Sequence, residues 1–116
     1  MYLIFDTETT GLAQNPKAPV TDLNNWPRMV QIAWQLHDKT GKLLSRENLI
    51  IKPDGYTIPY NTVKIHGITT ERALAEGHEL LEVLEKLEAD IKKADFGVGH
   101  NIIFDYNVAG AEFLRA

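Results

Sequence analysis

The chain has 116 residues, of which 44% are hydrophobic and 24% are charged, and it contains no cysteine. This length suits a single domain, the composition is typical of a globular protein rather than a disordered segment, and the lack of cysteine excludes disulfides and thiolate metal sites. The formal net charge of −4 argues against a broad phosphate-binding surface, because such surfaces are normally basic.

Neither a membrane span nor a secretion signal is recognisable in the sequence. No run approaches the roughly 18 apolar residues that a membrane helix needs, and the opening MYLIFD lacks the basic region of a signal peptide. We therefore expect a cytoplasmic protein without a membrane partner.

The first predicted strand, residues 2–8, is apolar on both faces. One face carries Tyr2 and Ile4, and the other carries Leu3 and Phe5. Because both faces are apolar, we expect a central strand in a sheet that is covered on both sides.

The same strand ends in two carboxylates, Asp6 and Glu8, which project to one side because they are two residues apart. At the usual rise of a strand their Cα atoms would lie about 6–7 Å apart, so the longer side chains can converge on one cation. Threonines and Gly11 follow, and glycine permits a turn and the close approach of a ligand to the backbone. A solvated strand end, where acids are common, explains these residues alone equally well.

Two more strands are predicted after a loop. Residues 13–27 hold three prolines with several Asn and Asp, which indicates a loop. Residues 28–38 and 42–53 are both typical of strands, and DKTG at 38–41 favours a turn, so we expect a hairpin. The apolar face of the second strand consists of Val30, Ile32, Trp34 and Leu36.

The stretch from 55 to 77 is predicted to be mostly irregular. Its sequence indicates one short helix at 70–75, just before Gly77. Thr69 or Thr70 is suited to cap that helix, because a threonine hydroxyl can accept from the free N–H groups of a first turn.

The last third of the chain is predicted to form helix, strand and helix. Residues 79–94 give the clearest helical pattern, 95–101 indicate a short buried strand, and 104–116 indicate a final helix. Together with the opening hairpin, this order predicts a mixed sheet in an α/β domain. Ligands of such domains usually bind at the carboxyl ends of strands, where Asp6 and Glu8 lie. The apolar stripe of the clearest helix consists of Leu80, Leu84, Leu87 and Ile91.

A third acid, Asp105, lies at the start of the final predicted helix, shortly after the strand that ends near His100. The helix dipole favours an acid in a first turn whatever its function. Taken alone, Asp105 is therefore better explained by structure than by catalysis.

Three segments together resemble the DEDD superfamily of 3′–5′ exonucleases, in particular the DnaQ-like proofreading group. FDTETTGL (5–12) resembles the first motif, GHNIIFD (99–105) the second, and IPYNTVKIHGIT (58–69) a segment between them. The resemblance implies a ribonuclease H-like mixed sheet with flanking helices. It also implies that residues 1–116 are a single exonuclease domain whose C-terminal part is missing.

The resemblance assigns metal-binding roles to the acids. Asp6 would bind two ions, Glu8 the first and Asp105 the second, and the ions would be Mg²⁺ or Mn²⁺. Two such ions about 3.5–4 Å apart activate the attacking water and stabilise the leaving oxygen of a phosphodiester. Carboxylate oxygens are the ligands that these hard cations prefer.

The resemblance also implies contacts to the terminal nucleotide. The backbone of Thr9, Thr10 and Gly11 would hold it, and other candidates are His66, Asn101 and Phe104. Phe104 is at least as well explained as a core residue, and His66 as a residue that orients its loop. The expected substrate is the 3′ end of single-stranded DNA.

The segment WPRMVQIAWQLHD (26–38), with the proline-rich insert before it, also resembles exonuclease segments in some large bacterial replicative polymerase chains. It implies a DNA polymerase III subunit or domain as a partner, and a role in proofreading during DNA replication.

The third motif of these enzymes, a helical H-x-x-x-x-D that supplies the general base, is missing. His100 to Asp105 matches the letters but belongs to the second motif, and His66 to Glu71 is only a looser match. The chain thus has three of four metal carboxylates and no base, and we expect it to be nearly inactive by itself. An uncovered apolar patch and self-association are expected for the same reason.

Two other functions remain open. The motifs do not separate DNA from RNA, because that choice depends on contacts to the 2′ position. An exonuclease acting on RNA is therefore one alternative, and a non-catalytic module that binds nucleic acid or protein is the other.

Overall fold

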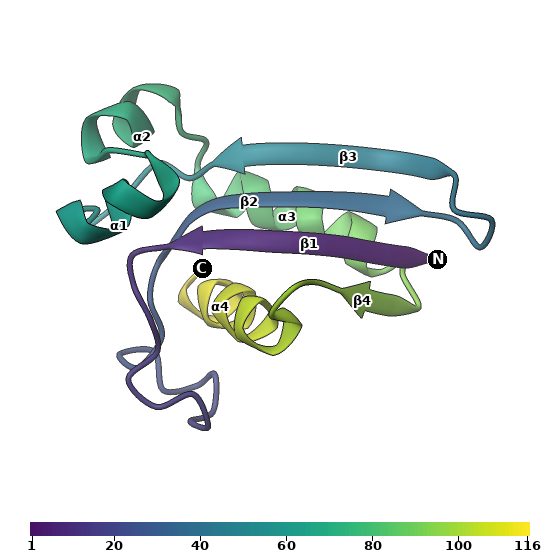
Figure 1. Ribbon diagram of the computed structural model, residues 1–116, viewed down its shortest axis with the longest axis horizontal. Helices are drawn as coiled ribbons and strands as arrows, with labels where there is room; N and C mark the ends of the chain where they lie inside the picture. Colours follow the sequence, from purple (N-terminus) through teal and green to yellow (C-terminus); the bar gives the residue numbers. More distant parts are fainter.

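A computed structural model describes residues 1–116 as a sheet of four strands with helices packed against it (Figure 1). The strands are β1 (Tyr2–Thr9), β2 (Met29–His37), β3 (Leu43–Ile50) and β4 (Phe96–Val98), and the helices are α1 (Tyr60–His66), α2 (Thr70–Glu76), α3 (Leu80–Ile91) and α4 (Ile102–Arg115). The strand order is β3-β2-β1-β4, with β1 antiparallel to β2 and parallel to β4. The predicted α/β class, the mixed sheet and the hairpin are confirmed.

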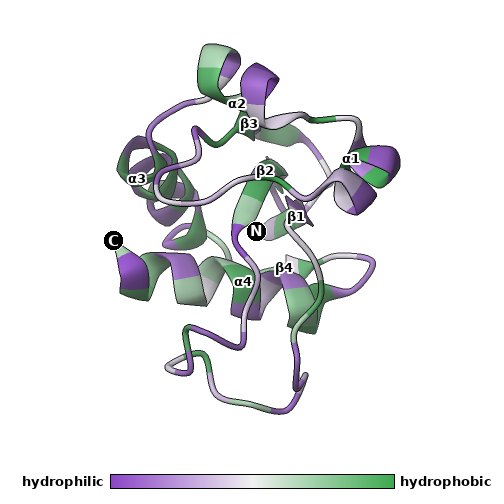
Figure 2. Ribbon diagram, turned by 90° about the vertical axis from the view of Figure 1, so that its left-hand side faces the viewer, coloured by the Kyte–Doolittle hydropathy of each residue, from purple (hydrophilic) through white to green (hydrophobic).

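The core lies between one face of the sheet and the helices α3 and α4. Figure 2 shows α3 beside the strands and α4 running below them. The apolar period predicted for β2 is confirmed, because all four of its inward residues are at most 1% exposed. The largest fully buried side chains of this core are Trp34, Met29, Ile32, Leu36, Ile51, Leu84 and Leu87.

The other face of the sheet is open, which corrects the expectation of cover on both sides. Tyr2 and Ile4 of β1 are 42% and 44% exposed, and the ring of Tyr2 stacks on Phe96 of β4 with centroids 5.5 Å apart. The prediction that 95–101 form a buried strand was wrong for the same reason. Phe96 and Val98 point to the open face, and Gly97, which faces Phe5 and Ile102, has no side chain to bury.

Helix α1 was not predicted. It has seven residues, and only Thr62 among them is buried, so it has no apolar stripe. It begins after Pro59 and ends at Gly67, whose φ of 75° is available to glycine at little cost. Helix α2 forms as predicted, and Thr69 is its cap, since the Thr69 hydroxyl accepts from the Arg72 N–H.

The buried stripe of α3 is rotated slightly from its prediction. Leu84 and Leu87 are buried as expected, but Val83 takes the place of Ile91, which is 41% exposed. The rotation also buries Asp90, whose carboxylate accepts from Trp34 Nε1 at 2.8 Å and from Ser45 Oγ at 2.8 Å. A polar anchor between helix and sheet thus helps to set the orientation of the helix.

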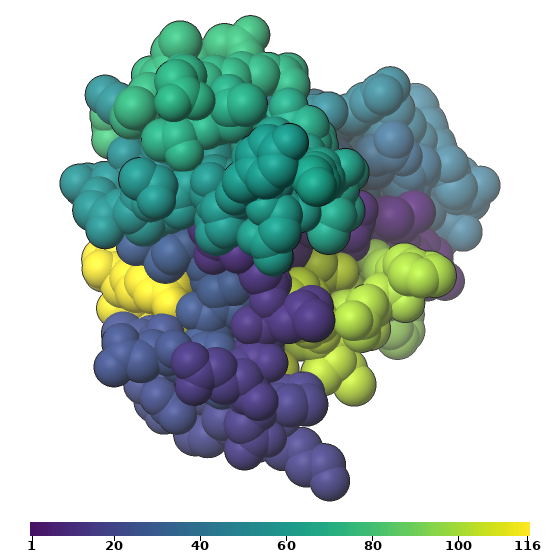
Figure 3. All heavy atoms as spheres, turned by 60° about the vertical axis from the view of Figure 1, so that its left-hand side comes forward, coloured from purple at the N-terminus to yellow at the C-terminus, as the bar shows by residue number.

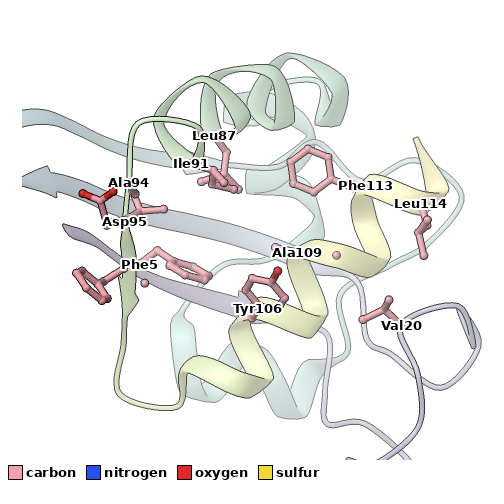
Figure 4. A pocket seen from close by; sticks show the side chains of 14 residues that line it. Phe5, Val20, Leu87, Ile91, Ala94, Asp95, Tyr106, Ala109, Phe113 and Leu114 are labelled. Atoms are coloured by element: carbon pink, nitrogen blue, oxygen red, sulfur yellow. The ribbon is translucent and has the colours of Figure 1, made fainter. Parts of the chain in front are cut away.

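An apolar groove of about 620 Å³ opens beside the free edge of β4, between the C-terminal half of α3 and α4. Figure 4 shows the side chains that surround it, among them Ile91, Tyr106 and Phe113. Phe96 and Leu114 also line the groove and are more than half exposed. The structure therefore has the uncovered apolar surface that the sequence led us to expect.

None of the helices is both long and apolar enough to cross a membrane.

Candidate active site

The first motif lies at the carboxyl end of β1, which runs between β2 and β4. Asp6 is exposed on the open face of the sheet, and Glu8 is half-buried two residues further on. Thr7, between them, is buried on the opposite face. The alternation of side chains predicted for this strand is therefore observed, and one short segment presents polar groups to both faces.

The second motif reaches the first through Thr7. One carboxylate oxygen of Asp105 accepts from the Thr7 hydroxyl at 2.6 Å and from the Thr7 N–H at 3.2 Å. Asp105 lies in the first turn of α4 and is only 3% exposed. Sequence reasoning missed Thr7, although a threonine between two acids of a strand must point to the opposite face and can meet a helix there.

Burial raises the pKa of the Asp105 carboxyl. The two hydrogen bonds from Thr7 oppose this shift because they stabilise the charged form, and the nearby Asp6 charge adds to it. His100 lowers the same pKa more weakly. The carboxylates of the two motifs are thus close enough to influence each other.

The loop after β1 is fixed by Arg28. The Thr10 N–H donates to the Arg28 carbonyl at 2.9 Å, and the Arg28 N–H donates to the Thr10 hydroxyl at 3.0 Å. The Thr9 hydroxyl donates to the Gly11 carbonyl at 2.6 Å. Since the Thr10 N–H is already paired, the Gly11 N–H is the first free backbone donor of the loop.

The remaining substrate candidates lie in different surroundings. The Nδ1 atom of His66 accepts from the Ile68 N–H at 3.0 Å, so this residue does orient its loop, while its Nε2 is buried without a partner. Asn101 is exposed just before α4 and makes no capping bond with its side chain. Phe104 is half-buried and packs against the main core, as its structural interpretation predicted. Contacts of these residues to a nucleotide stay predictions.

The acids offer a donor set that suits a hard cation, because all of their ligating atoms are carboxylate oxygens. The second oxygen of Asp105 makes none of the hydrogen bonds of the structure, so it is available to an ion. No three acidic or histidine side chains are grouped closely enough to hold a metal together in the present arrangement. The convergence of Asp6, Glu8 and Asp105 on shared ions stays a prediction.

A family model described as Exonuclease (RNase_T) matches residues 3–116. The chain belongs to this exonuclease family. The membership confirms the resemblance to the DEDD superfamily that the motifs indicated. A search of curated proteins gave no significant match to this exonuclease domain.

Solved structures of exonuclease I have the same fold. The complex of E. coli exonuclease I with a dT13 oligonucleotide matches with a TM-score of 0.77 and 25% identity. The match covers 98% of this exonuclease domain and 23% of the exonuclease I chain. The dA16 complex gives a TM-score of 0.78 with the same identity and coverage. A product-bound exonuclease I gives 0.77 with 25% identity, and it covers 98% of this domain and 25% of that chain. The predicted ribonuclease H-like fold is confirmed, and the domain spans about a quarter of the length of these enzymes.

Proposed function

We propose that this exonuclease domain removes nucleotides from the 3′ end of single-stranded DNA with the help of divalent ions. The hydrogen bonds between Asp105 and Thr7 carry the proposal, since they join the second motif to the strand that bears Asp6 and Glu8. The likeness to exonuclease I bound to dT13 and dA16 supports single-stranded DNA as the substrate.

In this proposal Asp6, Glu8 and Asp105 would hold Mg²⁺ or Mn²⁺. Bound ions supply the activation of water and the stabilisation of the leaving 3′ oxygen. Thr7 orients one oxygen of Asp105 and leaves the other free. Burial raises the pKa of Asp105, and a bound cation would oppose that shift because it favours the charged form. The free Gly11 N–H is suited to donate to a phosphate or sugar oxygen of the terminal nucleotide.

We expect the 116-residue chain to release nucleotides slowly. It supplies three carboxylates, and its one H-x-x-x-x-D, from His100 to Asp105, belongs to the second motif and so leaves the third without a histidine. A general base typically contributes 10²–10⁴-fold. A proofreading role would additionally require association with a DNA polymerase, which co-purification would reveal.

The proposal is tested by Mn²⁺ binding, measured by electron paramagnetic resonance, and by nucleotide release from a 3′-labelled single-stranded DNA. Asp6→Asn should abolish Mn²⁺ binding and any release, because it removes the ligand expected to contact both ions. Asp54→Asn is the matched control, since it removes an exposed acid in the loop after β3 and should leave both unchanged.

Two results would replace the proposal. Release from a 3′-labelled RNA that exceeds release from DNA of the same sequence would identify an RNA exonuclease. Binding of single-stranded DNA that is unaffected by EDTA or by Asp6→Asn, without any release, would instead indicate a non-catalytic module.

A further inference from the structure

The most deeply buried acid of the domain, Glu112 of α4, is not part of either motif. Its side chain is 0% exposed, and its Oε1 accepts from Arg28 Nε at 2.9 Å and from the guanidinium of Arg115. Its Oε2 is buried without a partner. A buried carboxylate is costly to desolvate and is tolerated where cations pair with it, so this position has a specific task in the fold.

One partner of Glu112 leads directly to the first motif. The backbone of Arg28 pairs twice with Thr10, as described above, and its guanidinium lies 4.4 Å from the ring centre of Tyr56. A single residue therefore separates the Glu112 carboxylate from the loop that follows Asp6 and Glu8. When Glu112 holds the Arg28 side chain, it also fixes the backbone to which Thr10 is bound.

The other partner anchors the same end of the helix to the long loop. Arg115 donates to the Leu23 carbonyl at 2.6 Å and to the Trp26 carbonyl at 2.9 Å. Figure 3 shows the end of α4, in yellow, lying against the blue residues of this loop. The loop enters β2 next to Arg28. The side chains of Arg28 and Arg115 therefore both connect Glu112 to the segment that precedes β2.

Helix α4 has two attachments of this kind, at Asp105 and at Glu112. Asp105 and Glu112 are seven residues apart, which is about 10 Å along a helix axis. The helix is thus held at two points, at Asp105 by Thr7 and at Glu112 by Arg28.

We propose that Glu112 is a positioning residue for the proposed exonuclease reaction. Through Arg28 it sets where the loop from Thr9 to Gly11 lies relative to Asp105, and hence where the terminal nucleotide lies relative to the metal carboxylates. The placement of the loop rests on the hydrogen bonds of Glu112, Arg28 and Thr10. The placement of the nucleotide rests on the proposed function.

The test compares Glu112→Gln with Asp90→Asn in the 116-residue chain. Both changes neutralise a buried, hydrogen-bonded acid of a helix, but Asp90 binds Trp34 and Ser45, with no connection to the loop. The first measurement is hydrogen exchange of the Thr10 amide relative to the most protected amides of β2. The second is the dissociation constant of thymidine 5′-monophosphate in the presence of Mn²⁺.

Glu112→Gln should speed relative exchange at Thr10 and weaken nucleotide binding, each by about tenfold, because the hydrogen bond from Arg28 loses the carboxylate charge that strengthens it. Asp90→Asn should lower the melting temperature but change neither measurement. Arg28→Met should give the same result as Glu112→Gln. Because it leaves Glu112 paired with Arg115, it provides a second test if Glu112→Gln fails to fold.

Equal behaviour of Glu112→Gln and Asp90→Asn, or unchanged exchange at Thr10 in both Glu112→Gln and Arg28→Met, would overturn the inference. A parent chain that binds no nucleotide with Mn²⁺ would count against the proposed function instead. In that case exchange at Thr10 still decides whether Glu112 fixes the loop.

Discussion

Thr7 shows how a single residue joins the two halves of the candidate site. It lies in a strand between two acids, but its hydroxyl and its N–H both serve a third acid on the opposite face. The sheet thus carries the acids of the first motif on its open side and the support of Asp105 on its covered side. Since Thr7 is the only link of this kind between β1 and Asp105, its removal has a defined effect.

Thr7→Val should destabilise the domain by about 1–2 kcal/mol, because a buried carboxylate loses a hydrogen bond from a hydroxyl. The pKa of Asp105 should rise further, since that bond favours the charged form. Chemical denaturation and carboxyl NMR titration measure the two effects. Thr62→Val is the control, as it removes a buried hydroxyl that donates to the Pro59 carbonyl; an equal shift of the Asp105 pKa in that variant would contradict the assignment.

The raised pKa of Asp105 also predicts a pH dependence. A carboxyl whose folded pKa lies above its unfolded value binds a proton more tightly in the folded state, so the free energy of unfolding falls as pH rises through the interval above the ordinary value of 3.8. Asp105→Asn keeps an acceptor for Thr7, and it removes this decrease in the free energy of unfolding because the amide does not titrate. Without metal, its melting temperature should exceed that of the parent by a few degrees at pH 7 and by less at pH 3.

Asp38→Asn is a control of opposite sign for the pH experiment. Hydrogen bonds from Thr40 and Lys42 lower the pKa of Asp38, so its stabilising effect is present at neutral pH and is lost as pH falls through the lowered value. This variant should be less stable than the parent at pH 7. Equal melting temperatures of the parent and of Asp105→Asn at pH 7, measured without metal, would refute the predicted linkage.

Among the elements, the turn between β4 and α4 carries the second motif and depends on close approach to β1. A Cβ atom at Gly99 would lie 2.8 Å from the Phe5 carbonyl oxygen and 3.3 Å from Ile102 Cδ1. Backbone atoms cannot yield as a flexible side chain can, so any larger residue at this position must displace the turn. The start of α4, and Asp105 with it, would move away from the strand.

Gly99→Ala should therefore destabilise the domain by about 1–3 kcal/mol, the usual cost of overpacking, and it should disturb the NMR signals of Thr7. Gly97→Ala is the matched control two residues earlier, because its nearest contacts would be ordinary ones of 3.8 and 3.9 Å. Thr7 signals that remain unchanged in Gly99→Ala would show that the turn can adjust without moving the helix.

Regular patterns predicted the elements that tertiary contacts do not alter. The alternation in β2 and the leucines of α3 are visible in the sequence because burial repeats with the period of the element. Helix α1 has no such period, since Thr62 is its only buried residue. The exposure of β4 depends on its place at the sheet edge, and the burial of Glu112 depends on Arg28, which is 84 residues distant. Only the folded chain reveals such pairings.

For the site, the motifs predicted the acids but not what holds them. Asp6, Glu8 and Asp105 were singled out as candidate metal ligands from their spacing and from the family resemblance. Thr7 and Arg28 were not, because their roles arise from contacts between segments that are far apart in the sequence. Both residues support the site through hydrogen bonds, and local sequence patterns do not reveal such a role.

At the scale of the whole molecule, the free edge of β4 and the apolar groove beside it form one uncovered surface. An exposed edge strand with apolar side chains is a template for pairing with another chain. The domain should therefore self-associate at high concentration, which sedimentation analysis at several concentrations can measure.

Val98→Lys should shift that association toward the monomer, because a lysine on an edge strand opposes pairing. Leu81→Lys introduces the same charge at an exposed leucine of α3 outside the groove, and it should have no such effect. Self-association that is equal in both variants would place the contact elsewhere on the molecule.

The contact between Thr7 and Asp105 has an evolutionary consequence. The two positions are 98 residues apart, yet neither can change freely while the other stays as it is. A related protein that keeps an acid at the position of Asp105 should keep a hydroxyl at the position of Thr7, and loss of the acid should release that constraint. Contacting pairs of this kind leave a correlated record in families of sequences. The pair thus ties the history of the first motif to that of the second, even though Thr7 itself binds no ion.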